Sequence, residues 1–160
     1  IQDIGTIEIE HFMSETYSVV RTWLLPILLE CLSKNKHIGQ PHKIFEQGIV
    51  LVRKDEEISE YQRIAILTSH EKADFTEVKQ VLDYIMRLLE LKYDIEDVEH
   101  NSFIPGRCGR VIVKKKKIAY IGEIHPIVLS NFGIETPVSA LEINVSELCR
   151  MERNLSSKYT

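Results

Sequence analysis

The sequence predicts an α+β fold in which helices flank a largely antiparallel sheet. Two pairs of strand-like segments, residues 43–53 with 61–69 and residues 110–113 with 118–121, are joined by short charged stretches, as in β-hairpins. Between the pairs, residues 74–91 repeat apolar side chains at helical spacing. The length of 160 residues suits one sizeable core, so we expect residues 1–160 to form a single domain.

The elements of the first half follow in chain order. Residues 6–10 alternate polar and apolar side chains, which indicates a short strand. Residues 21–32 are densely apolar, and Pro26 suits a first helical turn, so a helix is expected from Trp23 to Asn35 with Thr22 as the candidate cap. Residues 33–42 are expected to form a loop, and the acidic stretch 54–60 the turn of the first hairpin.

The second half begins with the clearest helix, which Asp74 caps and which is expected to reach Leu91, with Glu77 placed as in a capping box. Residues 95–100 predict an edge strand, 104–106 a turn, and 126–132 a short helix that ends at Gly133. Residues 138–145 alternate as a strand, and Ser146 opens a last helical turn. Together these elements predict a sheet covered by helices on one face.

Charge and composition limit the function. The net charge of -4 argues against a protein that grips nucleic acid mainly through phosphates, so any RNA contact should be local or supplied by a partner. No apolar run approaches the roughly 20 residues that cross a bilayer, and we expect no membrane association. Three widely spaced cysteines favour a reducing, cytoplasmic setting. Because the chain begins at Ile1, we expect it to be a fragment of a longer protein.

Three segments carry a family resemblance. Residues 20–30 read VRTWLLPILLE, residues 43–48 read KIFEQG, and residues 104–133 contain P-G-R, then I-G-E-I-H-P and N-F-G. In this order and spacing they resemble the β subunit of phenylalanyl-tRNA synthetases of the archaeal and eukaryotic type, whose patterns are L-R-T-x-L-L-P-x-L-L, F-E-x-G and P-G-R … I-G-x-I/L-H-P. Val20, where the family pattern has Leu, is a conservative departure. The resemblance covers roughly residues 14–145.

The resemblance implies a class II synthetase-like domain that is catalytically silent. In the family this domain pairs with an α subunit, which activates phenylalanine with ATP and charges tRNA(Phe), in an (αβ)2 heterotetramer. ATP and magnesium are then cofactors of the holoenzyme, and this domain is expected to hold no catalytic residue, cofactor or metal. Proofreading and a β-subunit magnesium site are expected in other domains, upstream of this segment.

The sequence lacks the arginines that an ATP site of class II enzymes needs at the expected positions. Class II enzymes present F-R-x-E on one strand, because an arginine fork binds phosphate oxygens, whereas here Glu46 follows Phe45. Arg107 and Arg110 precede a hairpin strand, and Arg63 is expected at a strand end or on a solvent face. The histidines and cysteines lack the spacing of a metal site.

Two surfaces are candidates for contacts. A tryptophan beside a charged residue is typical of an interface, whereas leucines at helical spacing are equally well explained by core packing. Both readings stay open for the candidate subunit interface, which comprises Arg21, Thr22, Trp23, Leu24, Leu25 and Leu28. A run of lysines at a hairpin tip is more often a solvated turn that protects a sheet edge than an RNA contact. The candidate RNA contact comprises Lys114, Lys115, Lys116 and Lys117.

The leading hypothesis is therefore a structural domain of the β subunit that pairs with the catalytic α subunit. One alternative is an RNA-contacting module built on residues 114–117. Another is a stand-alone synthetase-like domain that binds ATP, an amino acid or a different partner, because a fold does not fix a function.

Overall fold

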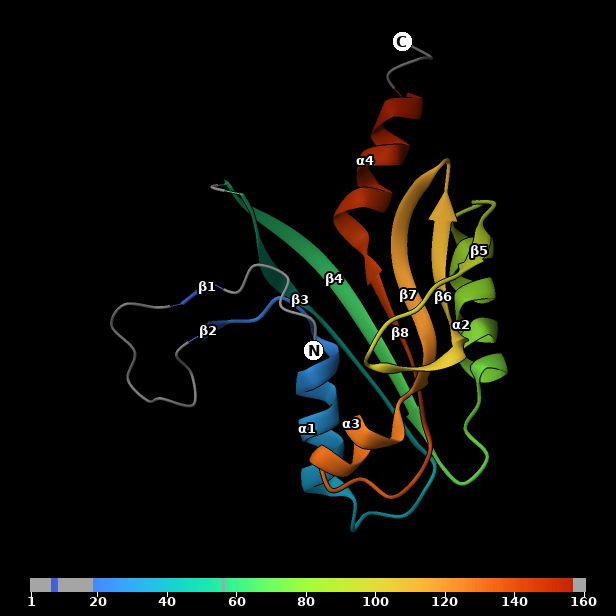
Figure 1. Ribbon diagram of the computed structural model, residues 1–160. Helices are drawn as coiled ribbons and strands as arrows, with labels where there is room; N and C mark the ends of the chain where they lie inside the picture. Colours follow the sequence, from blue (N-terminus) through green and yellow to red (C-terminus); the bar gives the residue numbers. More distant parts are fainter. Residues whose placement is uncertain (1–6, 9–18, 56, 157–160) are drawn as a thin grey trace.

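A computed structural model describes residues 7–8, 19–55 and 57–156. Six antiparallel strands form one sheet in the order β3-β4-β8-β7-β6-β5, and β1 and β2 pair separately (Figure 1). The antiparallel sheet of the sequence prediction is thus confirmed. The strands are β1 (Ile7–Glu8), β2 (Val19–Val20), β3 (His42–Lys54), β4 (Glu57–Ser69), β5 (Asp94–Asp97), β6 (Phe103–Val113), β7 (Lys116–Ile124) and β8 (Val138–Asn144).

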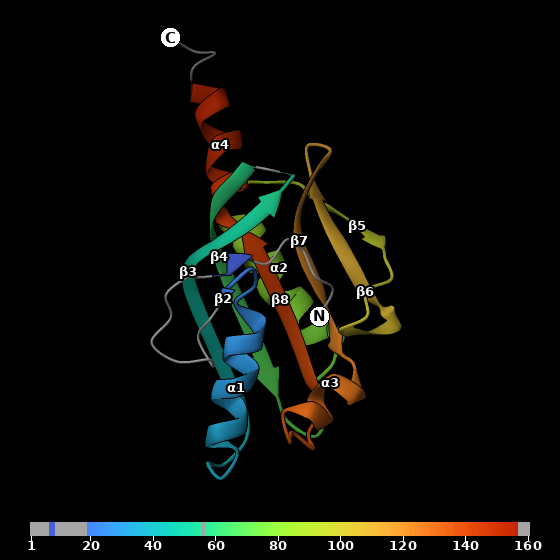
Figure 2. The same cartoon turned by 60° about the vertical axis from the view of Figure 1, so that its left-hand side comes forward.

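Helices cover both faces of the sheet, so the expectation of a single covered face is wrong. Helices α1 and α3 lie side by side on one face, and α2 lies on the opposite face (Figures 1 and 2). Central strand β8 explains the arrangement, since Val138 and Ala140 pack toward α1 while Leu141 and Ile143 pack toward α2. The helices are α1 (Leu25–Asn35), α2 (Phe75–Leu88), α3 (Pro126–Asn131) and α4 (Val145–Ser156).

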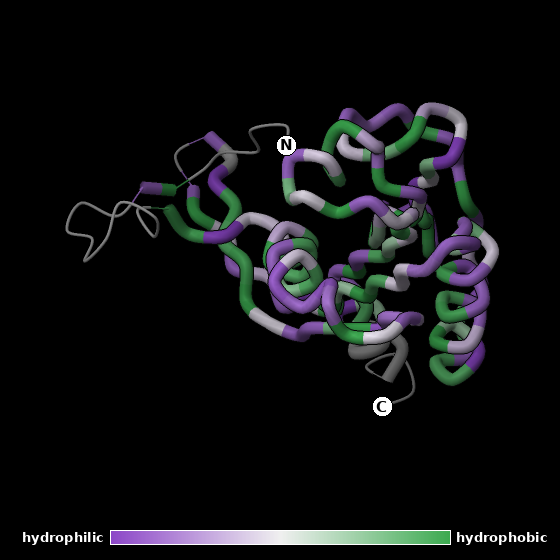
Figure 3. The backbone as a smooth tube through the Cα atoms, turned by 90° about the horizontal axis from the view of Figure 1, so that it is seen from below, coloured by the Kyte–Doolittle hydropathy of each residue, from purple (hydrophilic) through white to green (hydrophobic). Residues whose placement is uncertain are grey.

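Two hydrophobic cores result, one on each face. The α1 core joins leucines of α1 to Leu67 of β4 and Leu129 of α3, and the α2 core joins Leu82 to residues of β6, β7, β8 and α4. Hydrophobic and hydrophilic residues alternate at short intervals along the chain (Figure 3). Accordingly, none of the helices within the described residues is long and apolar enough to cross a membrane.

Several predicted boundaries are confirmed. The Asp74 side chain accepts the Glu77 backbone N–H at 3.1 Å and so caps α2, although the Glu77 carboxylate bonds to His70 and Thr68 instead of closing a capping box. Gly133 has a φ of +65° directly after α3, as a left-handed C-terminal cap requires. The edge position of β5 is also as expected.

Other boundaries differ from the prediction. The first hairpin turn is tighter than residues 54–60, because β3 and β4 pair from Lys54 with Glu57. The predicted turn at 104–106 lies inside β6, where the register shifts and Gly106 has a φ of +73°. Helix α2 ends at Leu88 rather than Leu91, and the expected last helical turn is the 12-residue α4.

Candidate functional site

The polar centre of the molecule lies on the α1 side of the sheet. Arg63 of β4, Glu142 of β8, Tyr120 of β7 and Arg110 of β6 contribute to it, and Trp23, just before α1, packs against them. We call these five residues the central cluster. Strand register aligns three of them, because Tyr120 pairs with Arg110 on one side and with Glu142 on the other.

Glu142 is the buried carboxylate of the central cluster. Its Oε1 accepts Arg63 Nη1 at 3.0 Å, and its Oε2 accepts the backbone N–H groups of Leu24 and Leu25, both at 3.0 Å. The side chain is 1% exposed, and burial raises the pKa of its carboxyl group. Glu142 therefore satisfies the first donors of α1, and the expectation that Thr22 caps this helix is wrong.

Rings fill the space beside this carboxylate. Trp23 lies 5.3 Å from Tyr120 and 5.7 Å from His100, measured between ring centroids. Arg63 Cζ lies 5.1 Å from the centroid of the Trp23 ring, and Arg110 Cζ lies 3.9 Å from the centroid of the Tyr120 ring. Burial lowers the pKa of His100, which favours its neutral form. The expectation that Arg63 lies at a strand end or on a solvent face is wrong, because it lies in the middle of β4 and its side chain is 15% exposed and ion-paired.

ATP does not fit the central cluster. The cavity beside Trp23 and His100 measures about 30 Å3, whereas pockets for drug-sized ligands typically measure about 300–1,000 Å3. Glu46, at the position where class II enzymes place arginine, is ion-paired to Arg21 at 2.5 Å. The described residues contain no group of three or more His, Cys, Asp or Glu side chains that could hold a metal ion.

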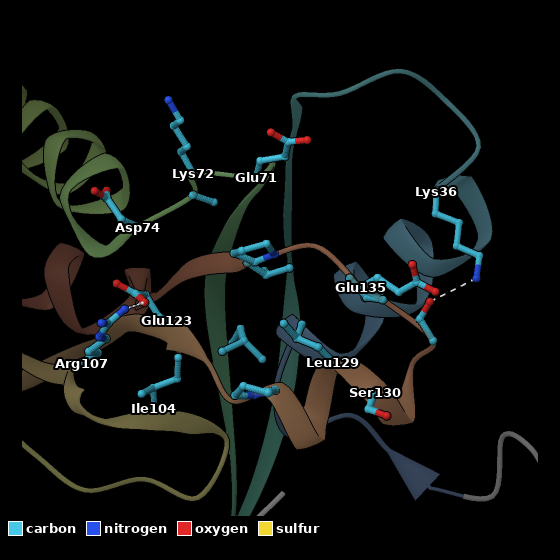
Figure 4. A pocket seen from close by; sticks show the side chains of 17 residues that line it. Lys36, Glu71, Lys72, Asp74, Ile104, Arg107, Glu123, Leu129, Ser130 and Glu135 are labelled. Atoms are coloured by element: carbon cyan, nitrogen blue, oxygen red, sulfur yellow. Dashed lines mark hydrogen bonds and ion pairs between the residues drawn. The ribbon is translucent and has the colours of Figure 1, made fainter.

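A wider cavity of about 890 Å3 opens where α3 and the loop before α2 meet (Figure 4). Its floor is apolar, and the protein itself engages some of the charged groups on its rim. Arg107 Nη1 donates to Glu123 Oε2 at 2.6 Å, and Lys36 Nζ donates to the Gly133 carbonyl at 3.1 Å. Glu123 also accepts the Phe75 N–H at 3.1 Å, so it helps to begin α2. These rim groups join elements of the fold to one another.

Most of the predicted interface residues are buried within the chain. Trp23, Leu24, Leu25 and Leu28 are all less than 9% exposed and belong to the α1 core. Only Arg21 and Thr22 are half-buried, and Arg21 Nε also donates to the Ile49 carbonyl at 2.8 Å. The four leucine and tryptophan side chains therefore build this domain, and a subunit contact at this segment stays a prediction.

The lysine run occupies a hairpin tip, as predicted. Lys114 and Lys115 form the two-residue turn between β6 and β7, with φ angles of 48° and 66°. Lys116 Nζ lies 3.1 Å from Glu147 Oε2 of α4, so one of the four charges is engaged by the protein. All four residues are exposed. Their contact with RNA stays a prediction.

Sequence reasoning missed an exposed apolar surface where edge strand β3 meets α2. It comprises Phe45, Ile49, Val81, Tyr84 and Leu88, of which Phe45 is 76% and Tyr84 60% exposed. A hollow of about 470 Å3 lies between Phe45 and Tyr84. We call these five residues the β3–α2 surface. The alternation of Phe45 and Ile49 was visible in the sequence, but the position of β3 at the other edge of the sheet was not.

Comparison with known proteins agrees with the fold. Residues 2–145 match the family described as phenylalanyl tRNA synthetase beta chain CLM domain. A pyrrolysyl tRNA synthetase of Desulfitobacterium hafniense superimposes with a TM-score of 0.71 over 85% of this chain and 51% of that chain. At 13% identity this likeness concerns the fold alone, and it confirms the class II synthetase-like prediction.

Curated relatives are closer in sequence. The chain is 45% identical over 148 residues to a phenylalanine–tRNA ligase β subunit of Thermococcus onnurineus and 43% identical over 148 residues to one of Pyrococcus furiosus. Each match covers 90% of this chain and 26% of the relative, so the chain spans about a quarter of the length of these relatives. The resemblance inferred from the sequence motifs is confirmed. The chain belongs to the family of phenylalanyl-tRNA synthetase β-chain CLM domains.

Proposed function

We propose that the chain is a structural, catalytically silent domain of a phenylalanine–tRNA ligase that assembles with the catalytic α subunit. The relatives are named as β subunits, which implies a partner subunit. In this proposal ATP, magnesium and tRNA(Phe) are bound by the assembled enzyme. The chain supports the active site of its partner and carries out no chemical step itself.

The observation that carries the proposal is the β3–α2 surface. Exposed large apolar side chains gather there beside a hollow, whereas scattered single ones are ordinary on a protein surface. Phe45 lies on an edge strand. Burying such an exposed aromatic side chain against a partner favours binding, because it removes a large apolar area from water.

The engaged arginines support the silent part of the proposal. Arg63 is paired with Glu142, Arg107 with Glu123 and Arg21 with Glu46. A guanidinium that shares a carboxylate of its own chain is partly neutralised and offers fewer free N–H groups to a transferring phosphate. These ion pairs also give a structural role to the family motifs, because Arg21, Glu46 and Arg107 are motif residues.

The test is assembly of the complete β subunit with the α subunit of the same organism. Phe45→Asp should weaken assembly by about tenfold or more, because a buried aromatic contact is replaced by a charge. Ile127→Asp is the matched control, since Ile127 of α3 is 66% exposed and lies outside the β3–α2 surface. Size-exclusion chromatography with light scattering over a concentration series measures the loss. Equal affinities of the two variants would overturn the assignment of this surface.

A further inference from the structure

Three buried donor atoms of the central cluster lack an acceptor. They are Trp23 Nε1, Arg63 Nε and Arg110 Nε, and the fourth such side-chain atom in the described part of the chain is Ser139 Oγ. An unsatisfied buried donor costs about 1–3 kcal/mol, so most buried donors in proteins have a partner. Three in one cluster point to an acceptor that comes from outside it.

These donors belong to one continuous stack. Arg63 lies over the Trp23 ring, Trp23 contacts Tyr120, and Arg110 lies over the Tyr120 ring. Burial lowers the pKa of Arg110, and the nearby charge of Arg63 lowers it further. The donors therefore border the same region of the α1-facing side of the sheet.

The cluster also carries an excess positive charge. Glu142 is its single carboxylate, and both of its oxygens are already bonded to Arg63 and to the first turn of α1. Among the described residues, Arg110 is held by the ring of Tyr120 and by a long 3.5 Å hydrogen bond to the Lys117 carbonyl. Glu96, which pairs with Arg110 across β5 and β6, forms no ion pair with it among the described residues.

We propose that the central cluster binds an oxoanion through Trp23, Arg63 and Arg110. A water molecule would offer an acceptor to one or two of the donors but would leave the charge of Arg110 uncompensated. An oxoanion supplies several acceptor lone pairs together with the missing negative charge. A cavity of about 30 Å3 adjoins Trp23 but is lined by neither arginine, so a ligand that reaches all three donors must be a single small group, either phosphate or carboxylate.

The sole tryptophan of the chain makes the site directly observable, because Trp23 yields one indole N–H resonance. The 160-residue chain is titrated with inorganic phosphate and, separately, with acetate at constant ionic strength. We expect a saturable shift of the indole resonance with at least one probe. Saturation by phosphate identifies a phosphate-class ligand, and saturation by acetate alone identifies a carboxylate. No saturable shift with either probe would overturn the proposal.

Variants separate this site from general charge effects. Arg110→Gln should weaken binding by about tenfold, the loss expected for one charge-assisted hydrogen bond. Arg87→Gln, at an exposed arginine of α2 in the other layer, should bind as the unaltered chain does. Equal losses in both variants would contradict a defined site. If Arg110→Gln does not fold, Arg110→Lys keeps the charge without the Nε–H and should still bind more weakly. Neither titration requires the α subunit, so the result is independent of the assembly proposal.

Discussion

Single residues of the family motifs hold this domain together. Arg21 crosses β3 at Gly48, where an added Cβ would lie 2.1 Å from Arg21 Nη2, and it ends on Glu46. The arginine of one motif thus pairs with the glutamate of the next and occupies the space that its glycine leaves free. Gly122 has a similar role, since a Cβ there would lie 2.6 Å from the Arg107 carbonyl in the bulge of β6. Each pattern encodes a close contact between elements that are distant in sequence.

Glu142 is the residue whose loss should cost most stability. Glu142→Ala leaves the buried Arg63 guanidinium unpaired and removes the acceptor of two α1 donors, so we expect a loss of about 3–5 kcal/mol in the free energy of unfolding. Urea denaturation of the 160-residue chain measures it. Glu46→Ala breaks an ion pair whose side chains are 34% and 26% exposed and should cost about 0–1 kcal/mol. Similar losses in the two variants would contradict this role of Glu142.

At the scale of elements, the β6–β7 hairpin contains a correctable strain. Its turn residues, Lys114 and Lys115, both have positive φ, which Asn and Gly adopt more readily than lysine. Replacing them by Asn-Gly should stabilise the chain by about 0.5–1 kcal/mol in urea denaturation. Lys72→Asn, at an exposed loop position, should change stability by less than about 0.5 kcal/mol. A hairpin variant no more stable than the control would contradict a strained turn.

The same hairpin variant bears on the RNA hypothesis. It removes two of the four lysines while the backbone of the turn is kept. If residues 114–117 contact tRNA, the complete enzyme carrying this variant should bind tRNA more weakly and with a smaller salt dependence. Unchanged binding would leave these lysines as a solvated turn.

Elements governed by local chemistry could be predicted from the sequence, and contacts between elements could not. The Asp74 cap and the Gly133 terminus depend on neighbouring residues, and both are where the sequence placed them. Arg63 was misplaced because β4 carries apolar residues toward both faces, so alternation does not tell which side of the strand is inside. Glu142 caps α1 from 118 positions away, and no signal near Thr22 reveals such a partner.

At the scale of the whole molecule, strand β8 couples the two cores. Its residues alternate between the α1 core and the α2 core, and the strand is buried between β4 and β7. Neither core can lose its packing on β8 without disturbing the sheet that supports the other. The two layers should therefore unfold together, as in a small two-state domain.

Leu82→Ala tests this coupling, because Leu82 is fully buried in the α2 core whereas the sole tryptophan, Trp23, lies in the α1 core. The cavity left by the substitution should cost about 2–5 kcal/mol. We expect the urea midpoint of Trp23 fluorescence to fall together with that of far-ultraviolet circular dichroism. Tyr84→Ala, at a 60% exposed position of the same helix, should leave both midpoints nearly unchanged. A fall in the circular dichroism midpoint alone would mean that the α2 layer unfolds separately from the α1 core.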